Sequence, residues 1–97
     1  MFYTYILYSS SFDRFYIGQT HDLIKRIERH NNGYVNSTKA YKPWEIVFFK
    51  RFETRAESMN YETFLKSKKS KDFISNLIKD FNENLPWVVK LVDKSRT

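Results

Sequence analysis

The chain has 97 residues, a net charge of +6 and no cysteine. This length provides one domain with one modest core, and the lack of cysteine excludes disulfides and thiolate metal ligands. No apolar run approaches the roughly 20 residues of a membrane span, and the first residues lack the basic region of a secretory signal. We therefore expect a soluble protein of a reducing, cytoplasmic compartment with no membrane partner.

The basic excess bears on the kind of partner. The chain carries 17 Lys and Arg residues against 11 Asp and Glu. On so small a body this excess favours a polyanion, because each phosphate contact releases a condensed counterion. A solvated surface whose charge only maintains solubility explains the same numbers, so charge alone leaves both alternatives open.

Two strands are predicted first. Residues 2–9 are rich in β-branched and aromatic types and predict a strand. Residues 9–13 supply a polar turn, and residues 14–18 predict a second strand that returns against the first. We expect this strand to end at Gly18, where the backbone turns sharply or a ligand approaches closely.

A helix is predicted next, over about residues 21–31. Thr20 is its expected N-cap, and Gly33 lies where a helix commonly ends in the left-handed conformation. Arg26 and His30, one turn apart, border its apolar stripe. The stripe consists of three residues: Leu23, Ile24 and Ile27.

A loop, a third strand and a second helix follow. Residues 34–43 are polar and contain a proline, which indicates a loop, and residues 44–52 contain the apolar run of a strand. Thr54 and Glu57 match a capping box, in which Thr is the N-cap and Glu is three residues further on. The second helix should therefore begin there and run to about Ser67.

The second helix carries an acidic side chain at the edge of its apolar face, because Glu62 lies three residues from both Met59 and Leu65. Ser70 is the expected N-cap of a third helix, which we expect Pro86 to end. The apolar residues of this helix have near-ideal helical spacing: Phe73, Ile74, Leu77, Ile78 and Phe81.

The C-terminal residues complete the predicted domain. Residues 87–92 form an apolar segment that we expect to dock in extended form, and residues 93–97 are expected to fray. A single domain over residues 1–92 results. Its order is ββαβαα, an α/β (α+β) fold with a small three-stranded antiparallel sheet flanked by helices.

Residue types exclude several chemistries. There is no thiol nucleophile, and His21 and His30 have no recognisable zinc spacing. Two glycines in the whole chain cannot form a Gly-rich phosphate loop, and the acidic residues are scattered rather than clustered as in a two-metal site. Tyrosines, arginines and isolated carboxylates remain as candidate functional groups.

Two segments resemble the pair of motifs that names the GIY-YIG nucleases: Tyr3-Thr4-Tyr5 and Phe15-Tyr16-Ile17-Gly18. Arg26, ten residues after Tyr16, and Glu62 in a later helix agree with this resemblance. The first motif departs from Gly-Ile-Tyr in a way similar to the compact bacterial branch. The chain also resembles the catalytic domains of the bacterial excinuclease and of eukaryotic structure-specific endonucleases. The resemblance runs from about residue 2 to residue 75.

The resemblance implies an endonuclease that uses Mg²⁺, or Mn²⁺ in its place, on nucleic acid, with DNA favoured over RNA. It implies that Arg26 clamps phosphate through its planar fork of donors and that Glu62 binds the metal. Tyr5 and Tyr16 would orient or deprotonate the attacking water, with Tyr16 the favoured base. A phenol has a reference pKa of about 10, so such a base needs a cationic or metal-rich site. His30 would assist proton relay or support a tyrosine.

Five basic residues are expected to contact nucleic acid: Arg29, Lys39, Lys66, Lys68 and Lys69. Ordinary structural roles compete with these assignments. The tyrosines could fill the core, Arg26 and Arg29 could form a solvated helix face, and Glu62 could pair with Lys66 one turn away. The order of the polar groups along the chain, bordering apolar stripes, favours the nuclease interpretation over these separate explanations.

Three rival functions stay open. The first is a non-catalytic nucleic-acid-binding module on the same fold. The second is a subunit that a protein partner activates and supplies with specificity, which a small surface favours because little of it can read a substrate. The third, a generic structural domain, requires the motifs to be accidental. The sequence leaves the oligomeric state open.

Overall fold

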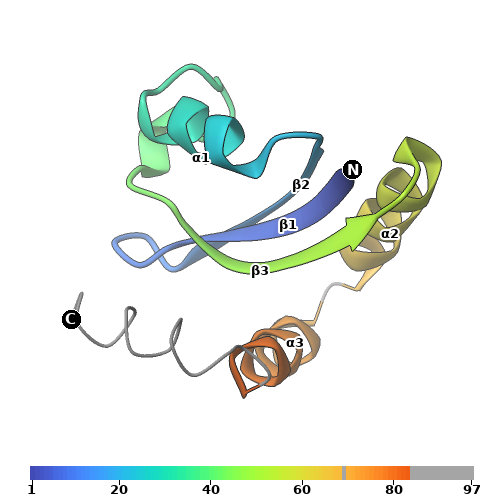
Figure 1. Cartoon of the computed structure of the whole chain (residues 1–97). Coiled ribbons are helices and arrows are strands. Elements are labelled where there is room, and N and C mark those ends of the chain that lie inside the picture. Colours follow the sequence, from blue (N-terminus) through green and yellow to red (C-terminus); the bar gives the residue numbers. More distant parts are fainter. Residues whose placement is uncertain (69, 84–97) are drawn as a thin grey trace.

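The computed structural model describes residues 1–68 and 70–83. Its elements are β1 (Phe2–Ser9), β2 (Arg14–Thr20), α1 (Leu23–Asn31), the 3-10 helix η1 (Lys39–Tyr41), β3 (Glu45–Phe52), α2 (Arg55–Ser67) and α3 (Lys71–Glu83) (Figure 1). This order confirms the predicted ββαβαα arrangement and the α+β class. None of the helices in the described ranges has the length and apolar character to cross a bilayer.

Some predictions fall on residues outside the described ranges. These are the phosphate contact by Lys69, the helix end at Pro86, the docked segment 87–92, the frayed end 93–97 and therefore the domain boundary at residue 92. The loop predicted over residues 34–43 contains η1, a single short turn.

The sheet has the strand order β2-β1-β3, with both pairs antiparallel. β1 lies in the centre, so each of its residues has a neighbour on both sides: Tyr5 pairs with Gly18 of β2 and with Phe49 of β3. The turn between β1 and β2 places Asp13 at a φ of +50°, a conformation that Asp tolerates better than most side chains. The sheet is therefore built around the first motif.

The two faces of the sheet carry separate clusters, because successive strand residues point to opposite sides. On one face, Tyr5 and Leu7 pack with Trp44, and α1 covers this side. On the other, Ile6 and Phe48 pack with residues of α2 and α3. Figure 1 shows α1 and α3 on opposite sides of the sheet, with α2 near the end of β3. Tyr5 and Tyr16 are thus separated from α3 by the sheet.

The N-terminal ends of α2 and α3 form as the sequence predicts. The Thr54 hydroxyl accepts from the Glu57 amide at 3.2 Å, and the Glu57 carboxylate accepts from the Thr54 amide at 3.2 Å, which confirms the capping box. At the start of α3, the Ser70 hydroxyl accepts from the Phe73 amide at 3.3 Å. Both expected N-caps therefore hold their helices.

The start of α1 differs from the prediction. Thr20 is the last residue of β2, paired with Tyr3, so it is not the N-cap. Asp22 takes that place, and its side chain accepts from the Lys25 amide at 3.1 Å. At the other end, Gly33 has a φ of +78°, which confirms the predicted left-handed end.

The buried faces of α1 and α2 are rotated from those expected. Ile24 is 67% exposed because α1 turns its His30 side toward the sheet, and Ile24 lies about 100° around the helix from Leu23, away from His30. Met59 is 49% exposed because the buried residues of α2 are Ser58 and Leu65. In both helices the rotation brings polar side chains closer to the sheet.

Candidate active site

The two strand tyrosines lie on the same face of the sheet. Tyr5 of β1 is opposite Gly18 of β2, and Tyr16 precedes Gly18 by two residues, so the two rings are diagonal neighbours. Their centroids are 6.4 Å apart. The Tyr5 side chain is buried, with 1% of the residue exposed, whereas Tyr16 is half-buried. Solvent therefore reaches Tyr16 and not Tyr5.

Gly18 makes room for the Tyr5 ring. A Cβ atom at this position would lie 2.5 Å from Tyr5 Cζ and 3.1 Å from Tyr16 Cε2. The prediction that Gly18 ends its strand is wrong, because β2 continues to Thr20. The close approach that needs a glycine is made by the tyrosine of the neighbouring strand, not by a turn.

His30 holds Tyr5 from inside the protein. The histidine is 0% exposed, and its Nε2 lies 3.1 Å from the Tyr5 hydroxyl. Its Nδ1 lies 2.8 Å from Thr38 Oγ1, which in turn donates to the Val35 carbonyl at 3.3 Å. His30 therefore supports a tyrosine, one of the two roles predicted for it, and has no exposed surface of its own.

This chain of contacts assigns the protons. The Thr38 hydroxyl has one hydrogen and gives it to the Val35 carbonyl, so it accepts from His30 Nδ1–H. His30 Nε2 is then the unprotonated nitrogen, and the Tyr5 hydroxyl donates to it. Burial, followed by the nearby Arg26 and Arg29, lowers the pKa of His30 to about 4. The imidazole is therefore neutral at neutral pH.

The Tyr5 hydroxyl is also where the other candidates meet. Burial raises the pKa of this phenol well above its ordinary value, and the neighbouring Tyr16 raises it further. The Arg26 guanidinium beside the hydroxyl acts in the opposite direction on the pKa, while the Glu62 carboxylate raises it. Side chains from β2, α1 and α2 thus act on one phenol of β1.

Hydrogen bonds between side chains and the backbone hold α1 and α2, the helices that carry Arg26 and Glu62, against the strands. The C-terminal end of α1 is fastened to the start of β3, because the Asn31 side chain donates to the Trp44 carbonyl at 2.9 Å and accepts from the Trp44 amide at 2.6 Å. The first turn of α2 is fastened to β1 by the Thr4 hydroxyl, which donates to the Ser58 carbonyl at 2.6 Å. Glu62 follows Ser58 by one turn, so it lies on the same side of α2 as the residue that contacts β1.

Glu62 forms the ion pair that the sequence allowed as an ordinary alternative. Its carboxylate lies 3.0 Å from Lys66 Nζ, with the side chains 22% and 55% exposed. An exposed pair at this spacing stabilises a helix by only about 0.2–0.5 kcal/mol, so Lys66 can leave it at little cost. In the described part of the chain no three His, Asp or Glu side chains gather as a metal site. A divalent ion at Glu62 would take most of its ligands from water and substrate, as Mg²⁺ commonly does.

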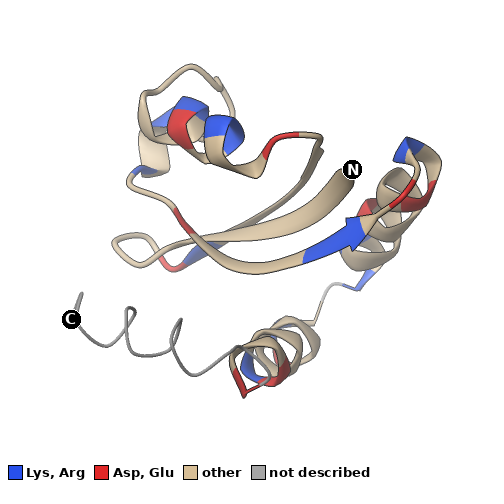
Figure 2. Cartoon of the chain, viewed as in Figure 1, with Lys and Arg blue, Asp and Glu red and all other residues tan. Residues whose placement is uncertain are grey.

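The other basic candidates are spread over several elements. Arg29 on α1 and Lys39 on η1 are exposed. Lys68 is exposed too, but its Nζ lies over the ring of Phe64, 5.0 Å from the centroid. Figure 2 shows Lys and Arg on α1, on the second half of β3 and on α2. The described residues therefore form no single basic stripe.

Thr38 contacts His30 directly, and the sequence alone assigned it no role in the site. It lies in the loop after α1, where no periodicity indicates which side chains turn inward. Its 1% exposure and its contact with His30 appear only in the folded chain. A buried Trp44, whose Nε1 donates to the Thr38 carbonyl at 2.9 Å, holds the residue in place.

Comparison with known proteins agrees with this arrangement. The GIY-YIG catalytic domain matches residues 1–76. The UPF0213 protein of Pediococcus pentosaceus is 37% identical over 62 residues, which cover 63% of this chain and 64% of that protein. The UPF0213 protein YazA of Bacillus subtilis is 40% identical over 52 residues, which cover 53% and 52%. The chain thus spans about half to two thirds of the length of these two relatives.

A third relative and a solved structure match more of the chain. A UPF0213 protein of Listeria monocytogenes is 38% identical over 71 residues, which cover 70% of this chain and 79% of that protein. The solution NMR structure of the UPF0213 protein BH0048 from Bacillus halodurans is similar with a TM-score of 0.51 and 28% identity, covering 81% and 84%. With the domain match over residues 1–76, they show that the chain belongs to the GIY-YIG family of nucleases.

Proposed function

We propose that the protein is a metal-dependent endonuclease that hydrolyses phosphodiester bonds in nucleic acid, with DNA as the favoured substrate. Family membership supports the nuclease class. The observation that carries the proposal is that Tyr16, Arg26 and Glu62, from three different elements, are all near enough to Tyr5 to influence its pKa, with the Tyr16 ring centroid 6.4 Å from that of Tyr5. Scattered surface residues would not share one neighbour.

The two phenols take different roles. Tyr5 is buried, neutral and engaged as a donor to His30, so it is poorly suited to accept a proton. Its oxygen can still accept a hydrogen bond from the neighbouring Arg26 guanidinium, which would help to orient that side chain. Tyr16 is the half-buried phenol that solvent can reach. We therefore assign to Tyr16 the positioning of the attacking water and the acceptance of its proton.

Arg26 binds the phosphate directly, and Glu62 acts on it through a divalent ion. The planar guanidinium of Arg26 donates to the nonbridging phosphate oxygens and stabilises the charge that grows on them. Glu62 supplies the carboxylate for a divalent ion. A bound Mg²⁺ would neutralise charge on the phosphate and on the leaving oxygen. Lys66, released from Glu62, can turn toward the phosphate backbone of the substrate.

The reaction balances with these groups. The water oxygen forms a bond to phosphorus while the bond from phosphorus to the leaving oxygen breaks. For this step Tyr16 acts as a phenolate that has already given its own proton to solvent. The proton of the water passes to the Tyr16 oxygen, and the leaving oxygen takes up a proton from solvent. Because phosphoryl chemistry of this kind depends on positioning and charge stabilisation, loss of either Arg26 or Glu62 should remove most of the activity.

A cleavage panel tests the proposal. The full chain is incubated with flap, branched, duplex and single-stranded DNA, and with matching RNA, in Mg²⁺, in Mn²⁺ and in chelator. We expect cleavage that needs the divalent ion and that falls by about 100-fold or more in Glu62→Gln and Arg26→Ala. Glu28→Gln and Lys25→Ala, at exposed positions of α1, are matched controls that should keep full activity.

Other outcomes select a rival function. Binding that weakens with salt, without cleavage of any substrate in any divalent ion, indicates a non-catalytic nucleic-acid-binding module. Activity that appears only after a partner is added, and that still requires Glu62, indicates a partner-activated protein. Circular dichroism of each variant shows whether lost activity reflects lost chemistry or lost fold.

A further inference from the structure

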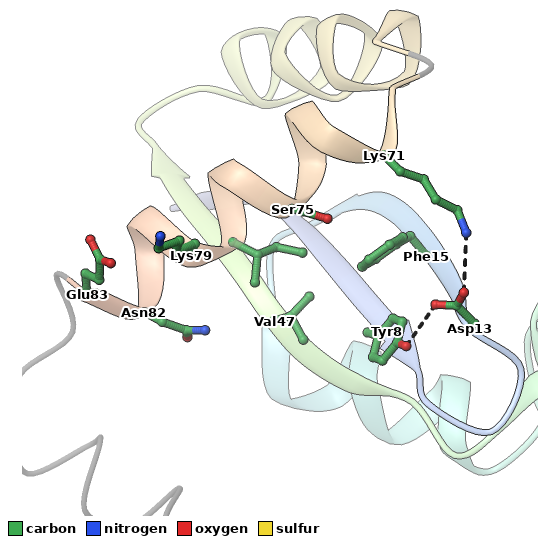
Figure 3. A pocket seen from close by; sticks show the side chains of 10 residues that line it. Tyr8, Asp13, Phe15, Val47, Lys71, Ser75, Lys79, Asn82 and Glu83 are labelled. Carbon is green, nitrogen blue, oxygen red and sulfur yellow. Dashed lines mark hydrogen bonds and ion pairs between the residues drawn. The ribbon is translucent and has the colours of Figure 1, made fainter.

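A large groove lies on the face of the sheet opposite Tyr5 and Tyr16. Its volume is about 620 Å³, and all three strands contribute to its floor, through Tyr8, Phe15 and Val47. Ile78 of α3 lines one wall. Figure 3 shows the strand side chains facing the helix, with Lys71 and Asp13 joined at one end. α3 therefore covers only part of this apolar face.

The groove is unsuited to nucleic acid. Its floor is apolar, and its rim carries both signs of charge, including Asp13 and Glu83 beside Lys71 and Lys79. A polyanion would meet carboxylates there as well as ammonium groups. The groove also lies across the sheet from Tyr5, so a strand bound in it would not reach the candidate active site. An apolar occupant fits it better.

The chain itself provides such an occupant. Glu83, the last residue of α3, lines the groove, and the residues that follow it, 84–97, lie outside the described ranges. Within 85–92 every residue except Lys90 is apolar: Leu85, Pro86, Trp87, Val88, Val89, Leu91 and Val92. We expect an apolar run of this length to be buried, because large exposed apolar patches are rare on protein surfaces.

Reach and connectivity agree with this occupant. An extended chain advances about 3.3 Å per residue, so eight residues span about 26 Å, comparable with the shortest dimension of the molecule, 27 Å. Pro86 disfavours a continued helix at this point. The domain match ends at residue 76, within α3, so residues 85–92 lie outside it.

We propose that residues 85–92 fold back into this groove and pack Trp87 against Val47 and Ile78. The segment would then cover the part of this sheet face that α3 does not cover. This proposal is independent of the nuclease activity, because the groove and the candidate active site lie on opposite faces of the sheet.

Nuclear magnetic resonance of the full chain tests the contact directly. We expect nuclear Overhauser effects from the Trp87 ring to the methyl groups of Val47 and Ile78, with Trp87→Phe identifying the resonances against those of Trp44. Their absence, together with random-coil shifts for residues 85–92, overturns the proposal. Effects seen only between labelled and unlabelled chains overturn it too, because they place the segment of a second copy in the groove.

A blocking variant provides a second test. Ser75 is exposed and lines the groove, whereas Asn76 is exposed on the same helix and does not line it. We expect Ser75→Trp and Trp87→Ser to speed amide hydrogen exchange of residues 87–92 by about tenfold, and the double variant to add no more. Asn76→Trp is the matched control and should leave the exchange unchanged. Equal exchange in Ser75→Trp and the unaltered chain contradicts the proposal.

Discussion

Acidification should destabilise the protein through one buried histidine. His30 is 0% exposed and accepts a hydrogen bond from Tyr5 through Nε2. Protonation of Nε2 turns this acceptor into a donor and places a charge in a buried site. Burial, followed by the nearby Arg26 and Arg29, lowers the pKa of His30 to about 4 from its ordinary value of 6.5. In the unfolded chain the same imidazole binds its proton at the ordinary value.

The magnitude follows from linkage. Between pH 6.5 and about 4 the unfolded chain binds more protons than the folded one, so the free energy of unfolding falls as the pH falls through this window. A difference of about 2.5 units at 1.36 kcal/mol per unit corresponds to about 3 kcal/mol. That is a large part of the stability of a domain, which is commonly about 5–15 kcal/mol. Above pH 6.5 the contribution is fully present.

Urea unfolding followed by circular dichroism at a series of pH values measures this loss. His30→Gln removes the titrating group, and His21→Gln changes an exposed histidine as the matched control. We expect the unaltered chain and His21→Gln to lose about 3 kcal/mol more than His30→Gln across the window. Carboxylates such as Asp13 titrate in all three proteins, so their contribution cancels. Parallel curves for the unaltered chain and His30→Gln would refute the reasoning. Should His30→Gln not fold, a His30 resonance that titrates near 6.5 would refute it as well.

Three further predictions concern the same buried contacts. Gly18→Ala should destabilise the protein by about 1–3 kcal/mol, because the added methyl group overlaps the Tyr5 ring; an unchanged melting temperature would contradict this. Thr38→Val should cost about 1–3 kcal/mol in urea unfolding, since His30 Nδ1–H loses its acceptor, and Thr38→Ser should restore most of it. Tyr5→Phe should reduce cleavage less than Tyr16→Phe, because Tyr5 is the buried phenol; the reverse order in initial rates would assign the base to Tyr5.

Local signals in the sequence predicted the elements well. The strand over 2–9 and the capping box at Thr54 depend on neighbouring residues, and both are confirmed. The N-cap of α1 was displaced from Thr20 to Asp22, since both residues suit a cap and only the length of β2 decides between them. Ile24 was misplaced for a related reason: the rotation of a short helix depends on the surface it meets.

The sequence named candidate residues for the site but did not show how they are arranged in space. Resemblance to a family gave residues such as Tyr16, Arg26 and Glu62 from motif order alone. Tyr5 is buried because the register of β1 and β2 sets it against Gly18. These two positions are 13 residues apart in the sequence. The part played by Thr38 depends on how a loop folds over α1. Such long-range contacts leave no periodic trace in a sequence.

The row of hydrogen bonds behind the site ends at the Val35 carbonyl. A carbonyl oxygen has no hydrogen to hand onward, so a proton that entered this row through Tyr5 could travel no further than Thr38. We infer that the row holds Tyr5 in place and passes no proton onward beyond Thr38. If the protein hydrolyses phosphodiesters as proposed, the proton that the reaction releases must leave on the side of Tyr16 that solvent reaches.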